Sequence, residues 1–129
     1  MSKTIKLKND VYLDSSVIVH NRSKISDILN YSTNEVKIGK WIDGKPLYRI
    51  TKRFYFNNDN FDVGIPNLDK VVNMYGRSED GSRPINFFVM FGTTYYISTW
   101  MYGSNLYNQL SNEYVGYYNV TFEYTKTTD

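Results

Sequence analysis

Apolar and polar residues alternate with a period of two near the end of the chain. The apolar positions of this run are Tyr118, Val120, Phe122 and Tyr124, each followed by a polar residue. Successive side chains of a β-strand point to opposite faces, so these four residues share one face. The pattern predicts a strand over residues 118–125, with one face in a core and the other in contact with solvent.

A β-hairpin is predicted over residues 35–56. Two runs rich in apolar and β-branched residues flank the pair Asp43-Gly44, and such a pair between two strands is a strong hairpin signal. Pro46 follows the turn, and proline cannot donate a hydrogen bond to a neighbouring strand. Its position therefore indicates the end of a strand or the edge of a sheet.

The middle of the chain is expected to contain three further strands and one long connection. Apolar and aromatic runs predict strands near residues 70–75, 85–91 and 95–102. The run 85–91 contains almost no polar residue, which favours burial on both faces. Residues 103–114 are rich in Gly, Ser and Asn, and we expect them to form the connection.

Residues 1–33 are expected to form an arm that attaches the β-domain of residues 34–129. Apolar residues three and four apart predict a short helical turn over residues 23–30. The arm has too many apolar positions for a solvated tail, so we expect it to pair with its own sheet or with a neighbouring subunit. The candidate subunit interface consists of Ile5, Leu7, Val11, Leu13, Val17 and Val19.

Composition strengthens the all-β assignment. The chain has 129 residues, which suits one domain with its own core, and it contains no alanine. Aromatic residues make up 17% of the chain, including 13 tyrosines. Alanine favours helices, whereas tyrosine, phenylalanine and valine favour strands. We therefore predict an all-β fold, an antiparallel β-sandwich of jelly-roll-like form with about seven or eight strands.

Few residues could support catalysis or bind a cofactor. Cysteine is absent and His20 is the only histidine, so thiolate nucleophiles and most transition-metal sites lack their ligands. There is no glycine-rich phosphate-binding motif. The Asn- and Asp-rich run 57–62 suggests calcium, but it lacks the ligand order of an EF-hand loop. We expect no cofactor, no metal site and no enzymatic activity.

The carboxylates are expected to have structural roles. A glycosidase needs two carboxylates that face each other across a cleft. The candidates are Asp43, Asp59, Asp62, Glu79, Asp80 and Glu123. Turns, loops and solvated strand faces account for most of them, so a hydrolase is the weakest of the functional alternatives.

Positive charge is also limited. Arg49, Lys52 and Arg53 lie among aromatic residues, as in proteins that stack single-stranded nucleic acid. The formal net charge is only +2, however, and no RNA-binding motif is present, so we expect no nucleic-acid partner. No apolar run approaches the ~18 residues of a membrane span, and the basic N-terminus lacks the apolar segment of a signal peptide. We expect no membrane insertion.

The excess of tyrosine is the feature most indicative of function. Tyrosine and tryptophan offer rigid apolar area with a polar tip, which suits protein interfaces and the faces of sugars. Tyrosines near loops are freer to contact a partner than those of the last strand. The candidate contact residues are Tyr102, Asn105, Tyr107, Asn108 and Tyr114. A carbohydrate-binding module could also use Trp41 or Trp100.

Both ends of the chain resemble segments of phage tail, fibre and minor structural proteins. Residues 31–54, YSTNEVKIGKWIDGKPLYRITKRF, follow the recurrent pattern Y-S-T-x-E-x-x-I-G-x-W-x-D-G-K-P-L-Y. The ending YNVTFEYTKTTD, residues 118–129, is similar to the last strand of the same proteins. Residues 7–29 resemble the segment that leads into that domain, and I-P-N-L-D-K at 65–70 is a shorter match.

The resemblance implies a virion structural component made in the bacterial host cytoplasm. Such domains form receptor-binding tips, usually homotrimers with one β-sandwich in each subunit. We therefore expect a tail-fibre-like protein that trimerises and binds a host surface glycan or another virion protein. A stand-alone carbohydrate-binding module is the main alternative, and a glycoside hydrolase is a weaker one.

Overall fold

The computed structural model describes residues 29–129, and residues 33–129 form one compact unit. In this unit two antiparallel sheets make up an all-β sandwich, as the sequence predicts. Apart from Leu29, the helical residues described form one short 3-10 turn, η1, at Asn112–Tyr114. Of the predicted helical turn at 23–30 only the last two residues are described, and His20 and the six candidate interface residues of the arm lie outside the described part.

The first sheet has the strand order β1-β2-β8-β4. Its strands are β1 (Val36–Lys40), β2 (Pro46–Phe56), β8 (Gly116–Lys126) and β4 (Leu68–Ser78). The predicted hairpin is β1 and β2, and the Gly44 N–H donates to the Trp41 carbonyl oxygen at 2.9 Å to close its turn. β8 lies in the centre and pairs along its length with both β2 and β4.

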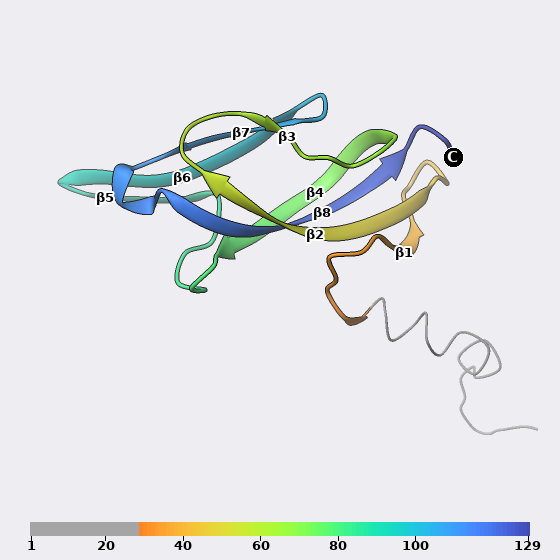
Figure 1. Ribbon diagram of the computed structural model, residues 1–129, viewed down its shortest axis with the longest axis horizontal. Coiled ribbons are helices and arrows are strands. Elements are labelled where there is room, and N and C mark those ends of the chain that lie inside the picture. Colours follow the sequence, from red (N-terminus) through yellow and green to blue (C-terminus); the bar gives the residue numbers. More distant parts are fainter. Residues whose placement is uncertain (1–28) are drawn as a thin grey trace, which may run out of the picture. The chain divides into compact units, whose positions relative to one another are not determined.

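The second sheet has the order β3-β7-β6-β5. Its strands are β3 (Phe61–Asp62), β7 (Asn105–Leu110), β6 (Thr93–Tyr102) and β5 (Phe87–Phe91). From β2 to β5 the chain passes to the other sheet at every step, as in a jelly roll. β5, β6 and β7 then follow one another as neighbours, and Figure 1 shows them in a layer separate from β2, β8 and β4.

The inner faces of the two sheets enclose the core. Tyr118, Val120, Phe122 and Tyr124 of β8 are at most 1% exposed, which confirms the face predicted from their alternation. The second sheet contributes buried residues from β6 and β7, among them Ile97, Leu106 and Leu110. Burial of these large side chains is the main source of stability of the domain.

The outer face of β8 is less exposed to solvent than the alternation predicts. Thr121 and Thr125 are 5% and 0% exposed. The Thr121 hydroxyl lies 2.8 Å from that of Thr51 on β2, and the Thr125 hydroxyl donates to Asp69 on β4. A central strand has a neighbour on each side, and short hydroxyl side chains are therefore covered by longer ones.

Two predictions about the middle of the chain are wrong. Residues 85–91 are not buried on both faces, because β5 is the edge strand of its sheet and Phe88 and Met90 are 64% and 67% exposed. Residues 103–114 are not a connection, because they contain β7 and η1. Asparagine disfavours strands and stands at an inward position of β7, where Asn108 interrupts the apolar alternation.

Candidate functional site

The outer face of the second sheet carries a cluster of exposed aromatic side chains. Along β6, Ile97 and Thr99 point into the core. The alternate positions, from Tyr96 to Tyr102, point outward. Trp100 and Tyr102 are 45% and 75% exposed. Large aromatic side chains on the outer face add nothing to the core, and exposed apolar patches of this kind mark contact surfaces.

The cluster is ordered by contacts between its rings. Trp100 and Tyr107 are directly opposite across β6 and β7, with ring centroids 5.7 Å apart and planes inclined by 10°. Tyr102 meets the edge of Tyr107 at 6.5 Å and 75°. Stacked and edge-to-face pairs each contribute about 0.5–1.5 kcal/mol, so the rings support one another in place.

A second aromatic pair lies further along the same face. Phe88 on β5 is opposite Tyr96 on β6. Ser98 and its partner Gln109 fall between this pair and the stacked pair. We call the set of five rings the aromatic face. It consists of Phe88, Tyr96, Trp100, Tyr102 and Tyr107.

A hollow of about 530 Å³ opens beside the stacked pair. Tyr96, Trp100 and Tyr107 line it. Four residues with amide side chains line it as well: Asn58, Asn108, Gln109 and Asn112. A site with rings on one side and amides on another can hold the apolar faces and the hydroxyl groups of one ligand.

An asparagine pair fixes one end of the hollow. Asn58 has a left-handed backbone (φ 71°) that asparagine tolerates, and its side-chain oxygen accepts from the Leu110 N–H at 2.8 Å. The Asn108 side-chain oxygen accepts from the Asn58 N–H at 2.8 Å, and the Asn108 amide donates to the Asp59 carbonyl oxygen at 2.6 Å. The hollow is therefore built on hydrogen bonds that need no ligand.

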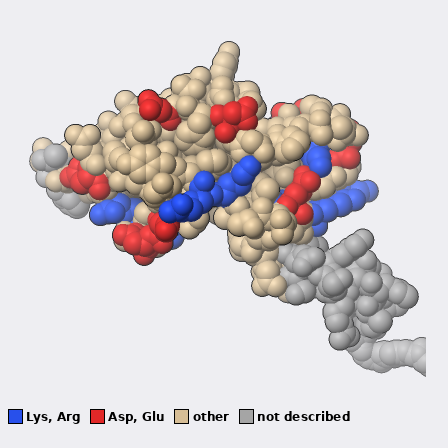
Figure 2. All heavy atoms as spheres, viewed as in Figure 1, with Lys and Arg blue, Asp and Glu red and all other residues tan. Residues whose placement is uncertain are grey.

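The aromatic face is free of charge. Residues 85–112, which include β5, β6 and β7, contain no Asp, Glu, Lys, Arg or His. At the β3 edge, Asp62 is exposed, but its carboxylate accepts from the Gly64 N–H at 2.7 Å and the Ser104 hydroxyl at 2.8 Å. In the face drawn in Figure 2, most Lys and Arg lie in the lower part, whereas several Asp and Glu lie in the upper part, at the level of β3 and β7 in Figure 1.

The structure brings only some of the predicted contact residues together. Tyr102, Asn105 and Tyr107 share the outer face of the second sheet. Asn108 is 4% exposed and its amide is engaged, so it supports the hollow and offers little to a ligand. Tyr114 lies on η1, half-buried, and lines a different hollow.

Sequence reasoning missed Tyr96, Gln109 and Asn58 and named Trp100 only as an alternative. The signal that could have found most of them is the charge-free run of residues 85–112, because its tyrosines, tryptophan and amides fall at alternate positions of β6 and β7. Trp41 lies at the β1–β2 turn of the first sheet and does not line the hollow.

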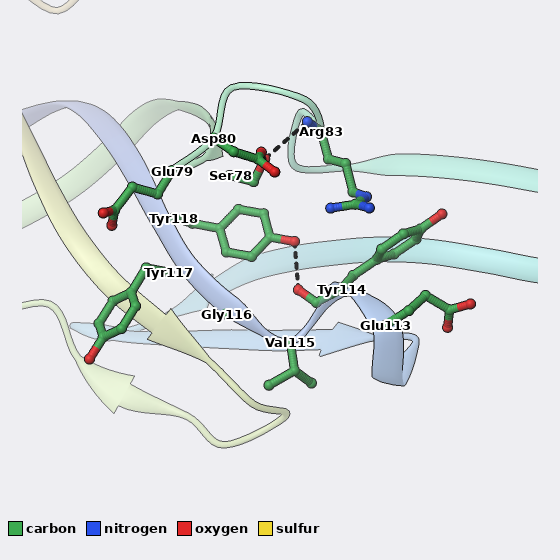
Figure 3. A pocket seen from close by; sticks show the side chains of 10 residues that line it. All are labelled: Ser78, Glu79, Asp80, Arg83, Glu113, Tyr114, Val115, Gly116, Tyr117 and Tyr118. Carbon is green, nitrogen blue, oxygen red and sulfur yellow. Dashed lines mark hydrogen bonds between the residues drawn. The ribbon is translucent and has the colours of Figure 1, made fainter.

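The second hollow, of about 300 Å³, lies between η1, the start of β8 and the loop after β4. Figure 3 shows the Arg83 guanidinium beside the Tyr114 ring. The Arg83 Cζ atom lies 4.6 Å from the ring centroid. The buried Tyr118 hydroxyl donates to the Tyr114 carbonyl oxygen at 2.7 Å. Glu79 and Glu113 point in opposite directions in this view, so they do not face each other as an acid and base pair would.

The remaining carboxylates proposed for a hydrolase mostly have structural partners. Asp43 accepts from the Lys45 N–H in the β1–β2 turn, and Glu123 accepts from the Tyr75 hydroxyl. Glu79 binds Arg53 through two hydrogen bonds, at 2.6 and 3.4 Å. Within residues 29–129, no group of three or more His, Asp or Glu side chains is placed to hold a metal ion.

The basic cluster is also engaged inside the domain. Arg53 pairs with Glu79 and lies 3.7 Å from the centre of the Tyr117 ring. Lys52 donates to the Gly64 carbonyl oxygen at 3.1 Å, and Arg49 is only 9% exposed. The three cations are therefore paired or buried within the domain, and the cluster leaves little free positive charge for a polyanion.

The hydrogen bonds of Asp80 in the loop after β4 are expected to make the stability of the domain depend on pH. Hydrogen bonds from the Ser78 hydroxyl (2.6 Å) and from the N–H and hydroxyl of Ser82 hold the pKa of Asp80 far below its ordinary value. A lowered pKa stabilises the folded state above the unfolded-state pKa of about 4, and this contribution is lost as the pH falls further. We expect the urea midpoint to fall between about pH 4 and pH 2, and to fall less in Asp80→Ala.

Asp59→Ala serves as the control for this measurement. It removes an exposed carboxyl to which no hydrogen bond is donated within the described residues. It should retain the acid dependence of the unaltered chain. An Asp80→Ala variant with the same acid dependence as Asp59→Ala would contradict the role assigned to Asp80.

Comparisons with protein families, with curated proteins and with solved structures find no match for this chain. Within residues 29–129, no helix is long and apolar enough to cross a membrane.

Proposed function

We propose that this domain binds without catalysis, as a phage virion component that attaches to a glycan of the bacterial surface. The observation that carries the proposal is the exposed, stacked pair of Trp100 and Tyr107 beside a hollow lined with amides. Sugars present C–H groups on their ring faces and hydroxyl groups at their edges. Aromatic rings pack on the former, and Asn and Gln side chains can both donate to and accept from the latter.

The virion assignment rests on the resemblance at the two ends of the chain. In this proposal the aromatic face is the host-contacting surface, and the arm of residues 1–33 joins the domain to other virion proteins or to two further copies in a homotrimer. The large aromatic area that the sandwich leaves outside its core supports a role in contact.

A stand-alone carbohydrate-binding module is the second candidate, because it would use the same aromatic face. The two candidates differ in oligomeric state. The virion proposal expects the purified full chain to have three times the monomer mass of 15.2 kDa in light scattering. A monomer that binds glycans would favour the stand-alone module.

The contact surface is tested by Trp100→Ala on an array of bacterial surface glycans. Aromatic residues at the centre of a contact contribute about 2 kcal/mol or more, so we expect binding to fall roughly 30-fold. The circular dichroism spectrum should be unchanged, and the loss of stability should not exceed the ~1.5 kcal/mol of the stacked pair, because Trp100 lies outside the core.

Trp41→Ala is the matched control, since it removes the other tryptophan from the turn of the first sheet. It should bind like the unaltered chain. Equal losses in the two variants, or unchanged binding by Trp100→Ala, would remove the aromatic face as the contact surface.

A further inference from the structure

The rings of the aromatic face are arranged in a row along β6. Along β6 the outward positions run Tyr96, Ser98, Trp100, and each has an outward partner on β5 or β7. An aromatic pair, a polar pair and a second aromatic pair therefore follow one another along the strand. Tyr96 and Trp100 are four residues apart, about 13 Å along an extended strand.

One sugar ring is too small to cover both aromatic pairs. The polar pair between them, Ser98 and Gln109, lies where a ligand that crosses from one pair to the other would present its hydroxyl groups. Exposed Tyr102 continues the row beyond Trp100. The face is therefore shaped for a chain of several sugar units that lies along β6.

The chemistry of the face also limits the charge of the ligand. An anionic glycan is held by arginine or lysine in most sites that favour it, and no cation occurs in residues 85–112. The exposed carboxylate nearest in the sheet, Asp62 on β3, would repel an anion. A cationic ligand has no carboxylate to meet on β5, β6 or β7.

We infer that the ligand is an uncharged polysaccharide that lies along β6 and contacts both aromatic pairs. This inference rests on the proposed function, because it names the class of glycan that the aromatic face binds. The neutral face, the amide-lined hollow beside it and the two separated ring pairs all agree with such a chain.

Charge is tested with affinity electrophoresis in native gels that contain a defined bacterial polysaccharide. Dextran, levan and curdlan serve as neutral probes, and hyaluronan, alginate and polysialic acid as anionic ones. We expect retardation by at least one neutral probe, by no anionic probe, and no effect of added salt. Retardation by anionic probes alone would overturn the inference.

Gln109→Lys and Gln109→Glu sharpen this test at the polar pair. The Gln109 residue is exposed, and within residues 29–129 its side chain forms no hydrogen bond, so either charge is accommodated. A neutral ligand should be weakened by both variants to a similar degree. An anionic ligand would instead be strengthened by Lys and weakened by Glu, by about fivefold each for an exposed ion pair.

Chain length is tested with oligosaccharides of whichever neutral polymer is retained. Affinity measured by calorimetry should rise from the disaccharide to the hexasaccharide. Tyr96→Ala should remove most of this rise and weaken the hexasaccharide more than the disaccharide, whereas Trp100→Ala should weaken every length. A disaccharide that binds as tightly as the hexasaccharide would exclude a chain along β6.

The outcomes separate the inference from the proposed function. If only anionic polymers bind and Trp100→Ala abolishes that binding, the aromatic face is a glycan site and the inference of a neutral ligand is wrong. If no polysaccharide binds, both are wrong. A third outcome is that Trp100→Ala leaves glycan binding unchanged and converts an oligomer to a monomer. The aromatic face is then a subunit interface, and both the inference and the proposed function are wrong.

Discussion

Phe122→Ala should destabilise the domain by about 3–5 kcal/mol. Phe122 is 0% exposed at the middle of β8, between Ile50 on β2 and Met74 on β4. Its ring meets Phe54 edge to face at 6.0 Å. Its removal leaves a cavity that two flanking strands cannot close without giving up their register with β8. A domain of this size has a total stability of about 5–15 kcal/mol, so the variant should be close to unfolding.

The measurement is unfolding in urea, monitored by tryptophan fluorescence and by circular dichroism. We expect the midpoint to fall by at least about 1 M. Phe122→Leu should lose less, because it keeps most of the apolar volume. Tyr117→Ala is the matched control on the same strand: its ring is 45% exposed and contacts Tyr55 and Arg53 on the outer face, so its loss should be about 1 kcal/mol. Similar losses for Phe122→Ala and Tyr117→Ala would mean that the inner face of β8 is not the core.

Gly76→Ala should cost about 3 kcal/mol, at the upper end of the range for overpacked sites. Gly76 lies on β4 opposite Val120 of β8. A Cβ atom at this position would collide with the Asn119 carbonyl oxygen and come within 2.9 Å of the Val120 Cα. Both obstacles are backbone of the central strand, so they cannot move aside as a side chain would.

The Gly76 backbone is also held on its other side. Its carbonyl oxygen accepts from the Ile85 N–H at 3.0 Å, which ties β4 to the segment that enters the second sheet. Added volume must therefore push β4 away from β8 and strain the link between the sheets. We expect a lower thermal midpoint and faster amide exchange in β4. Asn73→Ala, an exposed change on the same strand, should remain within about 0.5 kcal/mol.

These two variants and the binding variants act on different sheets. Phe122 and Gly76 belong to the first sheet, whereas Trp100, Tyr96 and Gln109 lie on the outer face of the second. A loss of glycan binding with a small loss of stability and a large loss of stability in the core can therefore be told apart. This separation is what makes the proposed contact surface testable in a domain of this size.

Part of the fold follows from local patterns. The alternation of Tyr118 to Tyr124 predicts the buried face of β8, because side chains of a strand alternate whatever surrounds them. Asp43-Gly44 predicts the β1–β2 turn, where Gly44 has a φ of 88° that glycine adopts without strain. The absence of alanine and the aromatic content predict the β-class.

Other parts depend on neighbours that a local pattern does not contain. The run 85–91 is apolar enough for a central strand, yet Phe88 and Met90 are exposed because β5 ends its sheet. The asparagines of β7 give its sequence the character of a loop. The strand forms because Leu106 and Leu110 are buried in the core and because the Asn108 side-chain oxygen accepts a hydrogen bond from the Asn58 N–H. Both errors concern long-range pairing, which sets what each face of a strand touches.

The sequence by itself determined the β-class, the first hairpin, the inner face of the last strand and the lack of thiol and imidazole chemistry in the described domain, because each depends on residue type or on spacing within one segment. Only the tertiary structure decided which tyrosines lie together. It placed Tyr107 against Trp100, moved Tyr114 to another hollow and turned Asn108 inward. The physical reason is that the register between strands decides which side chains share an outer face, and that register is set by the packing of the whole sandwich.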